Sequence, residues 1–295
     1  MRTCVIFNPA ARGDKARHFQ RHLNEIASEA ALKPTKRAGE ARRLSAEAVS
    51  EHFEVVVAAG GDGTVNEVLN GIADAGGFER TRLGVLPLGT VNVFAKELRL
   101  PQNVTSAWNV IQRGKDMRID APWASQIVEG KTQRRYFAQM AGAGLDSRAV
   151  ELVSWQLKKR FGPLAYFVAG LQALGEKLPL IEISNGHESA SGQLVLIGNG
   201  KFYGGRFTVF PLADLCDGVL EAVIFPRINL ETLARSGWGM MTDNFHTGRK
   251  TIQIKGSQLE LKCAASIPLQ LDGENVGPLP AMVGVLPRAL RVIVP

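Results

Sequence analysis

Cysteine is scarce in this sequence, which has three in 295 residues, Cys4, Cys216 and Cys263. They are odd in number, far apart and outside any CxxC pair or Cys/His cluster. This usage excludes a disulfide framework and a cysteine-based zinc site, and it fits a reducing cytoplasm.

Long apolar runs are also missing. At the N-terminus the apolar run 4–7 stops at Asn8-Pro9, which is too short for the core of a signal peptide. The best candidate for a membrane segment, residues 162–174, falls well short of the ~20 residues that a spanning helix needs. We therefore expect no transmembrane segment.

Aromatic residues make up only 7% of the chain, and the 35 Lys and Arg outnumber the 28 Asp and Glu to give a net charge of +7. A positive balance suits nucleic acid, an anionic membrane surface or phosphorylated small molecules. Because no basic run is interleaved with Tyr or Phe, the stacking platform of a nucleic-acid site is missing. We therefore expect no nucleic-acid partner.

The first third of the chain alternates apolar, β-rich runs with amphipathic stretches. This alternation predicts an α/β fold that begins with a doubly wound, Rossmann-like parallel sheet. The expected strands are residues 3–7, 55–59 and 83–86, and the expected helices are residues 15–32, 41–52, a short one from Val65, and 91–98.

After about Asp120 the chain becomes β-rich, with turn signals at Asn185-Gly186, Asn199-Gly200, Asp217-Gly218 and Asp272-Gly273. Their spacing predicts a mostly antiparallel β-sandwich, interrupted by a helical insert over residues 147–178. We place a first domain at residues 1–119 and a second at 120–287. A strand over residues 288–295 could return to the first domain.

The segment 55–67, VVVAAGGDGTVNE, carries the strongest chemical signal. A buried strand runs into two glycines, then Asp62, then a helix whose first turn offers unpaired N–H groups, an arrangement that favours phosphate. A carboxylate among such amides suits a site where it holds Mg²⁺ or helps to activate a hydroxyl. A glycine-rich turn capped by Asp62 or Thr64 is the alternative, although it leaves Asn66-Glu67 unexplained.

An ordered set of motifs extends over nearly the whole chain. Gly60-Gly61-Asp62-Gly63-Thr64 with Asn66-Glu67 lies between Asn8-Pro9 and the segment 86–95, LPLGTVNVFA. These motifs resemble those of the diacylglycerol kinase catalytic family, which includes sphingosine, ceramide and bacterial lipid kinases. The resemblance continues through Ile119-Asp120, Gly144-Leu145-Asp146, Gly162-Pro163, Asn199-Gly200, Asp217-Gly218 and Leu271-Asp272-Gly273-Glu274.

The resemblance implies an ATP-dependent kinase with a nucleotide-binding first domain and a lipid-binding second domain. Thr35 and Thr90 have hydroxyl groups suited to ribose or phosphate oxygens, although each alone reads as a capping or turn residue. By position, the nucleotide site would be lined by Asn8, Pro9, Arg12, Thr35, Gly61, Asp62, Gly63, Thr64, Asn66, Glu67 and Thr90.

Two later Asp-Gly turns gain a role from the same resemblance. Glu274 would be the proton acceptor for the attacking hydroxyl, with Asp272 and Asp62 as further catalytic carboxylates. Asp217, with Asp214 and Val219, would hold Mg²⁺ through one carboxylate and backbone carbonyls. On sequence alone, a plain hairpin turn is the alternative at each place.

Val93 is the main departure from the family pattern, because many bacterial members have Asp there. The first loop also differs, reading Ala10-Ala11-Arg12-Gly13 where a small residue, Ser and Gly are usual. Metal stoichiometry and substrate identity are the properties that these changes affect. Val93 motivates the alternative of a catalytically silent protein that binds lipid or nucleotide.

The resulting prediction is a soluble lipid kinase that phosphorylates diacylglycerol. Kinases for a sphingoid base, a polyprenol, phosphatidylglycerol or NAD are the alternatives. In the helical insert, Lys158-Lys159-Arg160 precedes the apolar segment 161–171, a composition typical of interfacial helices and also of a helix packed on a sheet. We expect a cytoplasmic enzyme in peripheral contact with anionic membrane, and the sequence leaves a homodimer open.

Overall fold

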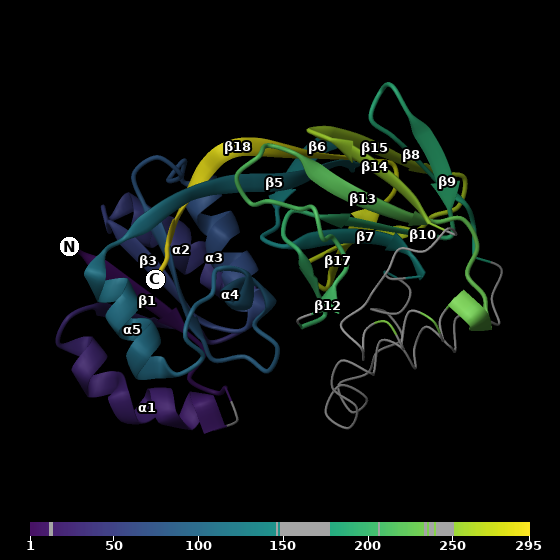
Figure 1. Ribbon diagram of the computed structural model, residues 1–295. Helices are drawn as coiled ribbons and strands as arrows, with labels where there is room; N and C mark the ends of the chain where they lie inside the picture. The colour runs from purple at the N-terminus through teal and green to yellow at the C-terminus, as the bar shows by residue number, and fades with distance from the viewer. Residues whose placement is uncertain are drawn as a thin grey trace. The chain divides into compact units, whose positions relative to one another are not determined.

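A computed structural model describes residues 1–11, 14–145, 147, 178–205, 207–232, 235, 239 and 251–295 (Figure 1). The chain forms two compact units. Unit 1 comprises Met1–Ala121 with Pro287–Pro295, and unit 2 comprises Pro122–Leu286. Two long strands, β5 (Asp116–Val128) and β18 (Ala281–Ile293), contribute residues to both units.

Unit 1 contains a parallel sheet in the order β2-β1-β3-β4, with β18 beside β4. Its strands β1 (Thr3–Phe7), β3 (Val55–Gly60) and β4 (Arg82–Pro87) are buried almost throughout, as expected for strands covered on both faces. Strand β2 (Ala31–Pro34) lies beside β1 at the sheet's edge. The C-terminal end of β18 joins in parallel, with Val292 opposite Leu83.

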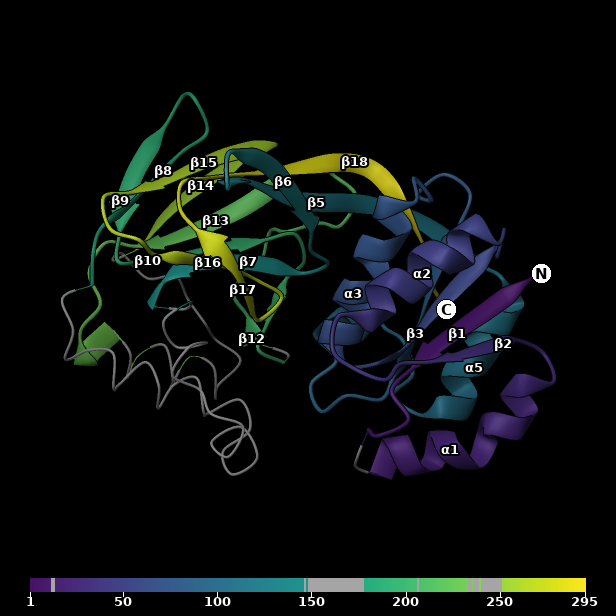
Figure 2. The same cartoon turned by 180° about the vertical axis from the view of Figure 1, so that it is seen from behind.

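Helices cover both faces of this sheet (Figures 1 and 2). Helices α2 (Glu40–Ser50) and α3 (Asp62–Asp74) pack together on one face, and α1 (Asp14–Ala27) and α5 (Val104–Arg113) lie on the other. The short α4 (Val93–Glu97) follows β4. Gly71 permits the close approach of α2, because a Cβ there would lie 2.1 Å from the carbonyl oxygen of Arg42.

Two helix boundaries differ clearly from those expected, and one helix was not expected. The first helix ends at Ala27 rather than Leu32, because residues 31–34 pair with β1, and this tertiary pairing overrides local helix propensity. Helix α3 begins at Asp62 rather than Val65, with Gly61 as its N-cap. Helix α5 was not expected, although its caps are recognisable, since Asn103 accepts from the backbone N–H of Ser106 at 2.8 Å and Gly114 is left-handed.

Unit 2 is built from two antiparallel sheets in the described residues. The first contains the unit 2 portions of β5 and β18 together with β6 (Lys131–Tyr136), β8 (Ile181–Ser184), β9 (Ser189–Gly192) and β15 (Gln258–Cys263). The second runs in the order β14-β13-β10-β7-β16-β17. Its strands are β7 (Met140–Gly144), β10 (Leu194–Gly198), β13 (Leu220–Phe225), β14 (Ile252–Gly256), β16 (Pro268–Leu271) and β17 (Glu274–Pro278). A separate short pair joins β11 (Phe202–Tyr203) to β12 (Phe207–Thr208).

The second sheet is covered on both faces. Its inner face packs against the first sheet through buried residues such as Val195, Leu259 and Val283. On its outer face, the segment 209–213 lays Val209 and Phe210 over the sheet. Consequently all six residues of β13 are buried, so a charged side chain in that strand has little access to water.

Several predicted features lie outside the described residues. These are Arg12, Asp146 and nearly all of the helical insert expected over residues 147–178, including Lys158, Lys159 and Arg160. In the parts of the chain that the structure does describe, no helix combines the length and the apolar character needed to cross a membrane.

Candidate active site

The loops predicted to bind nucleotide follow the carboxyl ends of neighbouring strands in unit 1. The strand registers place Phe7 opposite both Pro34 and Ala59, and Gly60 opposite Pro87. Asn8-Pro9, Thr35, Gly61 and Thr90 therefore lie along one edge of the parallel sheet. Ligands of open α/β sheets bind at this edge, where the strand order reverses.

Two glycine-rich loops meet at this edge almost backbone to backbone. The carbonyl oxygen of Gly60 accepts from the N–H groups of Leu88 and Gly89, at 2.9 and 3.3 Å. A Cβ on Gly89 would lie 2.5 Å from the Cα of Gly61. Gly89 therefore tolerates no side chain without displacing the other loop, and a Cβ on Gly61 would be tight, at 3.3 Å from the Cα of Gly89.

Asp62 ties the same two loops together. One of its carboxylate oxygens accepts a hydrogen bond from the backbone N–H of Phe94, in the first turn of α4, at 3.2 Å. Asn92, which is left-handed and almost fully buried, donates its side-chain amide to the carbonyl oxygen of Gly89 at 2.8 Å. The loop between β4 and α4 is therefore held by side chains from both motifs.

Glu67 has a structural partner. Its two carboxylate oxygens accept the backbone N–H groups of Gly39 and Ala41, each at 2.9 Å, which are the N-cap and an early residue of α2. A carboxylate in this position satisfies unpaired N–H groups and complements the helix dipole. Glu67 therefore fixes the segment after Thr35, whose own N–H donates to the carbonyl oxygen of Phe7 at 2.8 Å.

In unit 2, Asp272 and Gly273 form a two-residue turn between β16 and β17, with Leu271 opposite Glu274. Both central residues have positive φ, +49° and +90°, as a type I′ hairpin turn requires. The Asp272 carboxylate accepts three backbone N–H groups, those of Ala138, Gln139 and Met140, at 2.7 to 3.1 Å. Asp272 thus anchors the turn on the start of β7, and Glu274 is exposed beside it.

Buried amide side chains surround this anchor. The side-chain amide of Asn199 donates to the carbonyl oxygen of Ala138 at 3.3 Å, and that of Gln139 donates to the carbonyl oxygen of Phe202 at 3.0 Å. Both residues are nearly inaccessible to solvent. The segment before β7 is therefore held from two sides, and the position of Glu274 depends on it.

The predicted metal loop contains two tight turns. Asp214 accepts from the N–H of Cys216 and Asp217 from that of Val219, both at 2.9 Å. In each carboxylate the second oxygen remains for a cation, and both side chains are exposed. Hard oxygen ligands fit Mg²⁺. Because no three His, Cys, Asp or Glu side chains of the described residues form a metal cluster, backbone carbonyls or water would have to complete the site.

Comparison with known proteins covers almost the entire chain. Residues 2–123 match the diacylglycerol kinase catalytic domain, and residues 139–294 match the YegS C-terminal NAD kinase beta sandwich-like domain. A diacylglycerol kinase of Staphylococcus carnosus (strain TM300) is 30% identical over 304 residues, covering 100% of this chain and 95% of the relative. The chain belongs to the diacylglycerol kinase family. It is a lipid kinase, a phosphotransferase that uses ATP and an alcohol acceptor.

Solved structures agree on the fold. A diacylglycerol kinase from Bacillus anthracis str. Sterne is 23% identical with a TM-score of 0.78, covering 100% of this chain and 97% of that one. Yeast NADH kinase in complex with NADH is 11% identical with a TM-score of 0.58, covering 100% and 84%. An N-terminal α/β domain followed by a β-sandwich, as the sequence predicted, is therefore confirmed for this diacylglycerol kinase family member.

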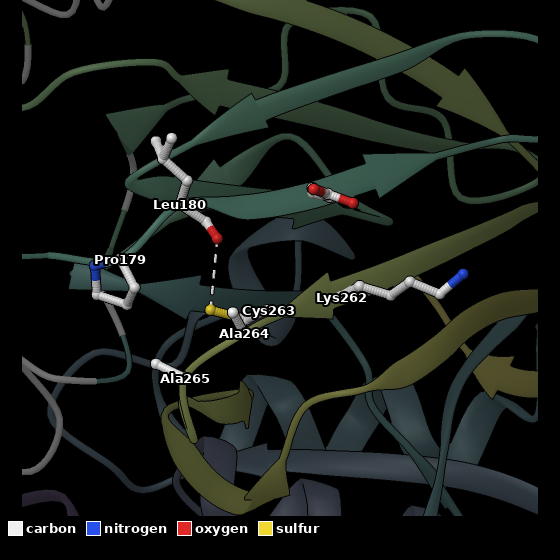
Figure 3. Close-up of a pocket in the computed structure, with 7 residues that line it drawn as sticks. Pro179, Leu180, Lys262, Cys263, Ala264 and Ala265 are labelled. Atoms are coloured by element: carbon white, nitrogen blue, oxygen red, sulfur yellow. Dashed lines mark hydrogen bonds between the residues drawn. The ribbon is translucent and has the colours of Figure 1, made fainter.

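One surface hollow of unit 2, about 680 Å³, lies apart from all the candidate residues. It is lined by residues 179, 180, 182 and 262–265, from β8, β15 and their flanking segments. Figure 3 shows the Cys263 thiol donating to the carbonyl oxygen of Leu180, at 3.4 Å, and Lys262 extending away from this pair. None of the residues predicted for this kinase lines the hollow.

Sequence reasoning missed one unusual group of this kinase, Glu221 in β13. It is 2% exposed, and burial raises the pKa of its carboxyl. Lys255 and the backbone N–H of Leu212 lower this pKa, and Asp217 raises it. Neither oxygen has a hydrogen-bond partner that meets ordinary geometry. A single acid within the apolar run 220–225 was the signal that could have found it.

Proposed function

We propose that this lipid kinase phosphorylates diacylglycerol to phosphatidic acid. Four loops converge on one edge of the unit 1 sheet, and three of them carry a family motif, which supports phosphoryl transfer from ATP. The similarity of the whole chain to a diacylglycerol kinase supports the choice of acceptor. Backbone N–H groups of the α3 first turn would bind phosphate oxygens, assisted by Thr64 and Thr90. Thr35 and Asn8-Pro9, at the ends of β2 and β1, would contact the rest of the nucleotide.

For the chemical step we propose Glu274 as the general base. A lipid hydroxyl must lose its proton as it accepts the phosphoryl group, and an exposed carboxylate on a rigid hairpin turn suits that task. Asp62 would balance positive charge at the phosphates. Asp272, whose carboxylate already accepts three amides, would act by positioning Glu274 and not by touching the substrate.

We propose Mg²⁺ as the metal of this enzyme. Mg²⁺ neutralises charge on the transferred phosphate when bound with ATP. Asp62 is the carboxylate among the phosphate-binding amides that suits this ion. Asp217, with the backbone carbonyls of Asp214 and Val219, would hold a second, structural ion.

The acceptor is tested by supplying radiolabelled ATP with a panel of alcohols. The panel contains diacylglycerol, a sphingoid base, a polyprenol, phosphatidylglycerol and NAD. The likeness of the fold to yeast NADH kinase makes NAD the most informative rival. Label in phosphatidic acid alone supports the proposal. Label in another product would identify that alcohol as the acceptor and contradict the choice of diacylglycerol. Nucleotide binding without transfer to any alcohol would indicate a silent protein, the alternative that Val93 motivates.

We also propose that the enzyme contacts anionic membrane peripherally through residues 158–171. The basic cluster Lys158-Lys159-Arg160 would contribute on the order of 1 kcal/mol per residue toward anionic lipid. Changing all three to Gln should weaken sedimentation with anionic vesicles, and binding by the wild type should fall with salt. Unchanged binding by a cooperatively melting variant would assign membrane access to another surface.

A further inference from the structure

Glu221 is a buried carboxylate that the proposed catalytic roles do not use. It lies in β13, between β10 and β14 in the second sheet of unit 2 (Figure 1). The side chain is 2% exposed, and both oxygens are buried without a hydrogen-bond partner. Such a group is costly unless a proton or a cation compensates its charge.

The charges that face Glu221 leave it uncompensated. Across the strand pairs, its neighbours are Gly198 on β10 and Lys255 on β14. Lys255 lies near enough to favour the charged form but makes no ion pair with Glu221 among the described residues, and Asp217 adds a second negative charge nearby. Glu221 is therefore a buried carboxylate without an ion-pair partner among the described residues, four positions after the exposed Asp217.

The side chain faces the metal loop. Glu221 lies on the same face of β13 as Val223 and Phe225, which belong to the outer-face cluster that Val209 and Phe210 cover. The chain continues directly from this cover into the two aspartate turns at 214–219. The backbone N–H of Leu212, next to this cluster in the chain, favours the charged form of the Glu221 carboxyl without meeting hydrogen-bond geometry. The buried carboxylate is thus turned toward the loop that carries Asp217.

We propose that Glu221 supplies a second, buried carboxylate to a divalent-cation site formed with Asp217 and the 214–219 loop. The inference rests on the proposed function only for the choice of this loop as a metal site. A hard cation bound by both groups would neutralise two like charges at once, and carboxylate oxygens are the ligands that such ions take. The site joins the loop to the middle of the sheet.

This arrangement predicts opposite effects of one substitution in two conditions. Glu221→Gln keeps the shape and removes the buried charge. In the presence of EDTA the variant should melt at or above the temperature of the wild type, because no carboxylate is left uncompensated. With Mg²⁺ the wild type should gain thermal stability and the variant should not.

The experiment uses the full chain without nucleotide, with Mn²⁺ as the probe ion. Titration calorimetry and melting curves are recorded for the wild type, Glu221→Gln and Asp217→Asn, with Glu188→Gln, an exposed acid in the β8–β9 turn, as a matched control. We expect one Mn²⁺ site in the wild type and in the control. In both test variants the affinity for Mn²⁺ should fall by about ten-fold or more.

Three results would overturn the proposal. If Glu221→Gln binds Mn²⁺ as tightly as the wild type and only Asp217→Asn loses affinity, the loop binds the ion without Glu221. If the wild type binds no Mn²⁺ without nucleotide, neither the loop site nor the role of Glu221 in it exists. If Lys255→Met destabilises the EDTA-treated protein and Glu221→Gln abolishes that loss, Lys255 is the partner instead. Transfer of label to diacylglycerol by the wild type, measured in parallel, tests the proposed function separately from all three.

Discussion

The Asp62 carboxylate accepts the backbone N–H of Phe94 at 3.2 Å, and this bond joins the GGDGT turn to the loop after β4. Asp62 therefore has two separable properties, an oxygen that holds α4 and a negative charge at the sheet edge that we propose to bind phosphate. An amide retains the first property and loses the second.

Asp62→Asn should consequently abolish phosphoryl transfer while the fold remains intact. The amide oxygen can still accept from Phe94, but it can neither balance Mg²⁺ charge nor accept a proton. The measurement is kcat with diacylglycerol, together with a melting curve. Asp74→Asn, the same change at the far end of α3, is the control and should keep its activity. Normal kcat in folded Asp62→Asn would remove this residue from the chemistry.

Glu274→Gln should lower kcat by roughly 10²-fold or more, with ATP affinity largely preserved, if this residue takes the proton of the lipid hydroxyl. Glu274 is exposed at its turn, so the melting temperature should not change. Glu188→Gln serves as a control in the same unit. A collapse of ATP affinity with normal residual kcat would make Glu274 a binding residue and move the base elsewhere, to Asp62 first.

Asp272→Asn should mainly lower the stability of the protein, in contrast to Glu274→Gln, which should mainly lower kcat. Its carboxylate accepts three backbone N–H groups, and an amide would turn an NH₂ group toward at least one of these donors. Losing a charged acceptor and leaving a donor unpaired costs on the order of 2 kcal/mol or more. Chemical denaturation measures this directly, with Glu274→Gln as the neighbouring reference. Equal stability of the two variants would contradict the anchoring role.

Glu67→Gln should weaken the attachment of α2. One of the two amide hydrogen bonds, to Gly39 or Ala41, is lost, which costs about 1–3 kcal/mol. Because the segment after Thr35 loosens, KM for ATP should rise more than kcat falls. Glu47→Gln provides the control, because Glu47 is a half-buried acid of α2 whose ion pair is with Arg43 of the same helix. A large loss of kcat without loss of stability would instead indicate that Glu67 acts on the phosphates themselves.

The sequence predicted what depends on local pattern. Apolar runs and glycines identified β1, β3, β4 and the turn at Asp62, and Asp-Gly pairs identified the hairpin at Asp272. The partners of these residues could not be predicted, because they lie far away in sequence: Glu67 meets Gly39 and Ala41 across more than 25 residues, and Asp272 meets residues 138–140 across more than 130. Such pairs arise only when helices and strands pack.

The same limit explains the boundaries that were wrong. Residues 28–32 have a helical composition, and only the pairing of β2 with β1 makes Ala31–Pro34 extended. Helix α3 begins at Asp62 because Gly61 is its N-cap, and nothing in the apolar periodicity marks that position. For the same reason, the burial of Glu221 becomes apparent only when the segment over β13 is in place.

Phosphorus NMR of one reaction tests the central claim most directly. Wild-type enzyme, ATP, Mg²⁺ and diacylglycerol in mixed micelles are followed without any coupled assay. Since the enzyme transfers the γ-phosphoryl group to the lipid hydroxyl, the phosphate monoester of phosphatidic acid should appear in step with ADP, one for one. Unchanged ATP, or ADP accompanied by inorganic phosphate and no lipid monoester, would contradict the assignment of diacylglycerol as the acceptor.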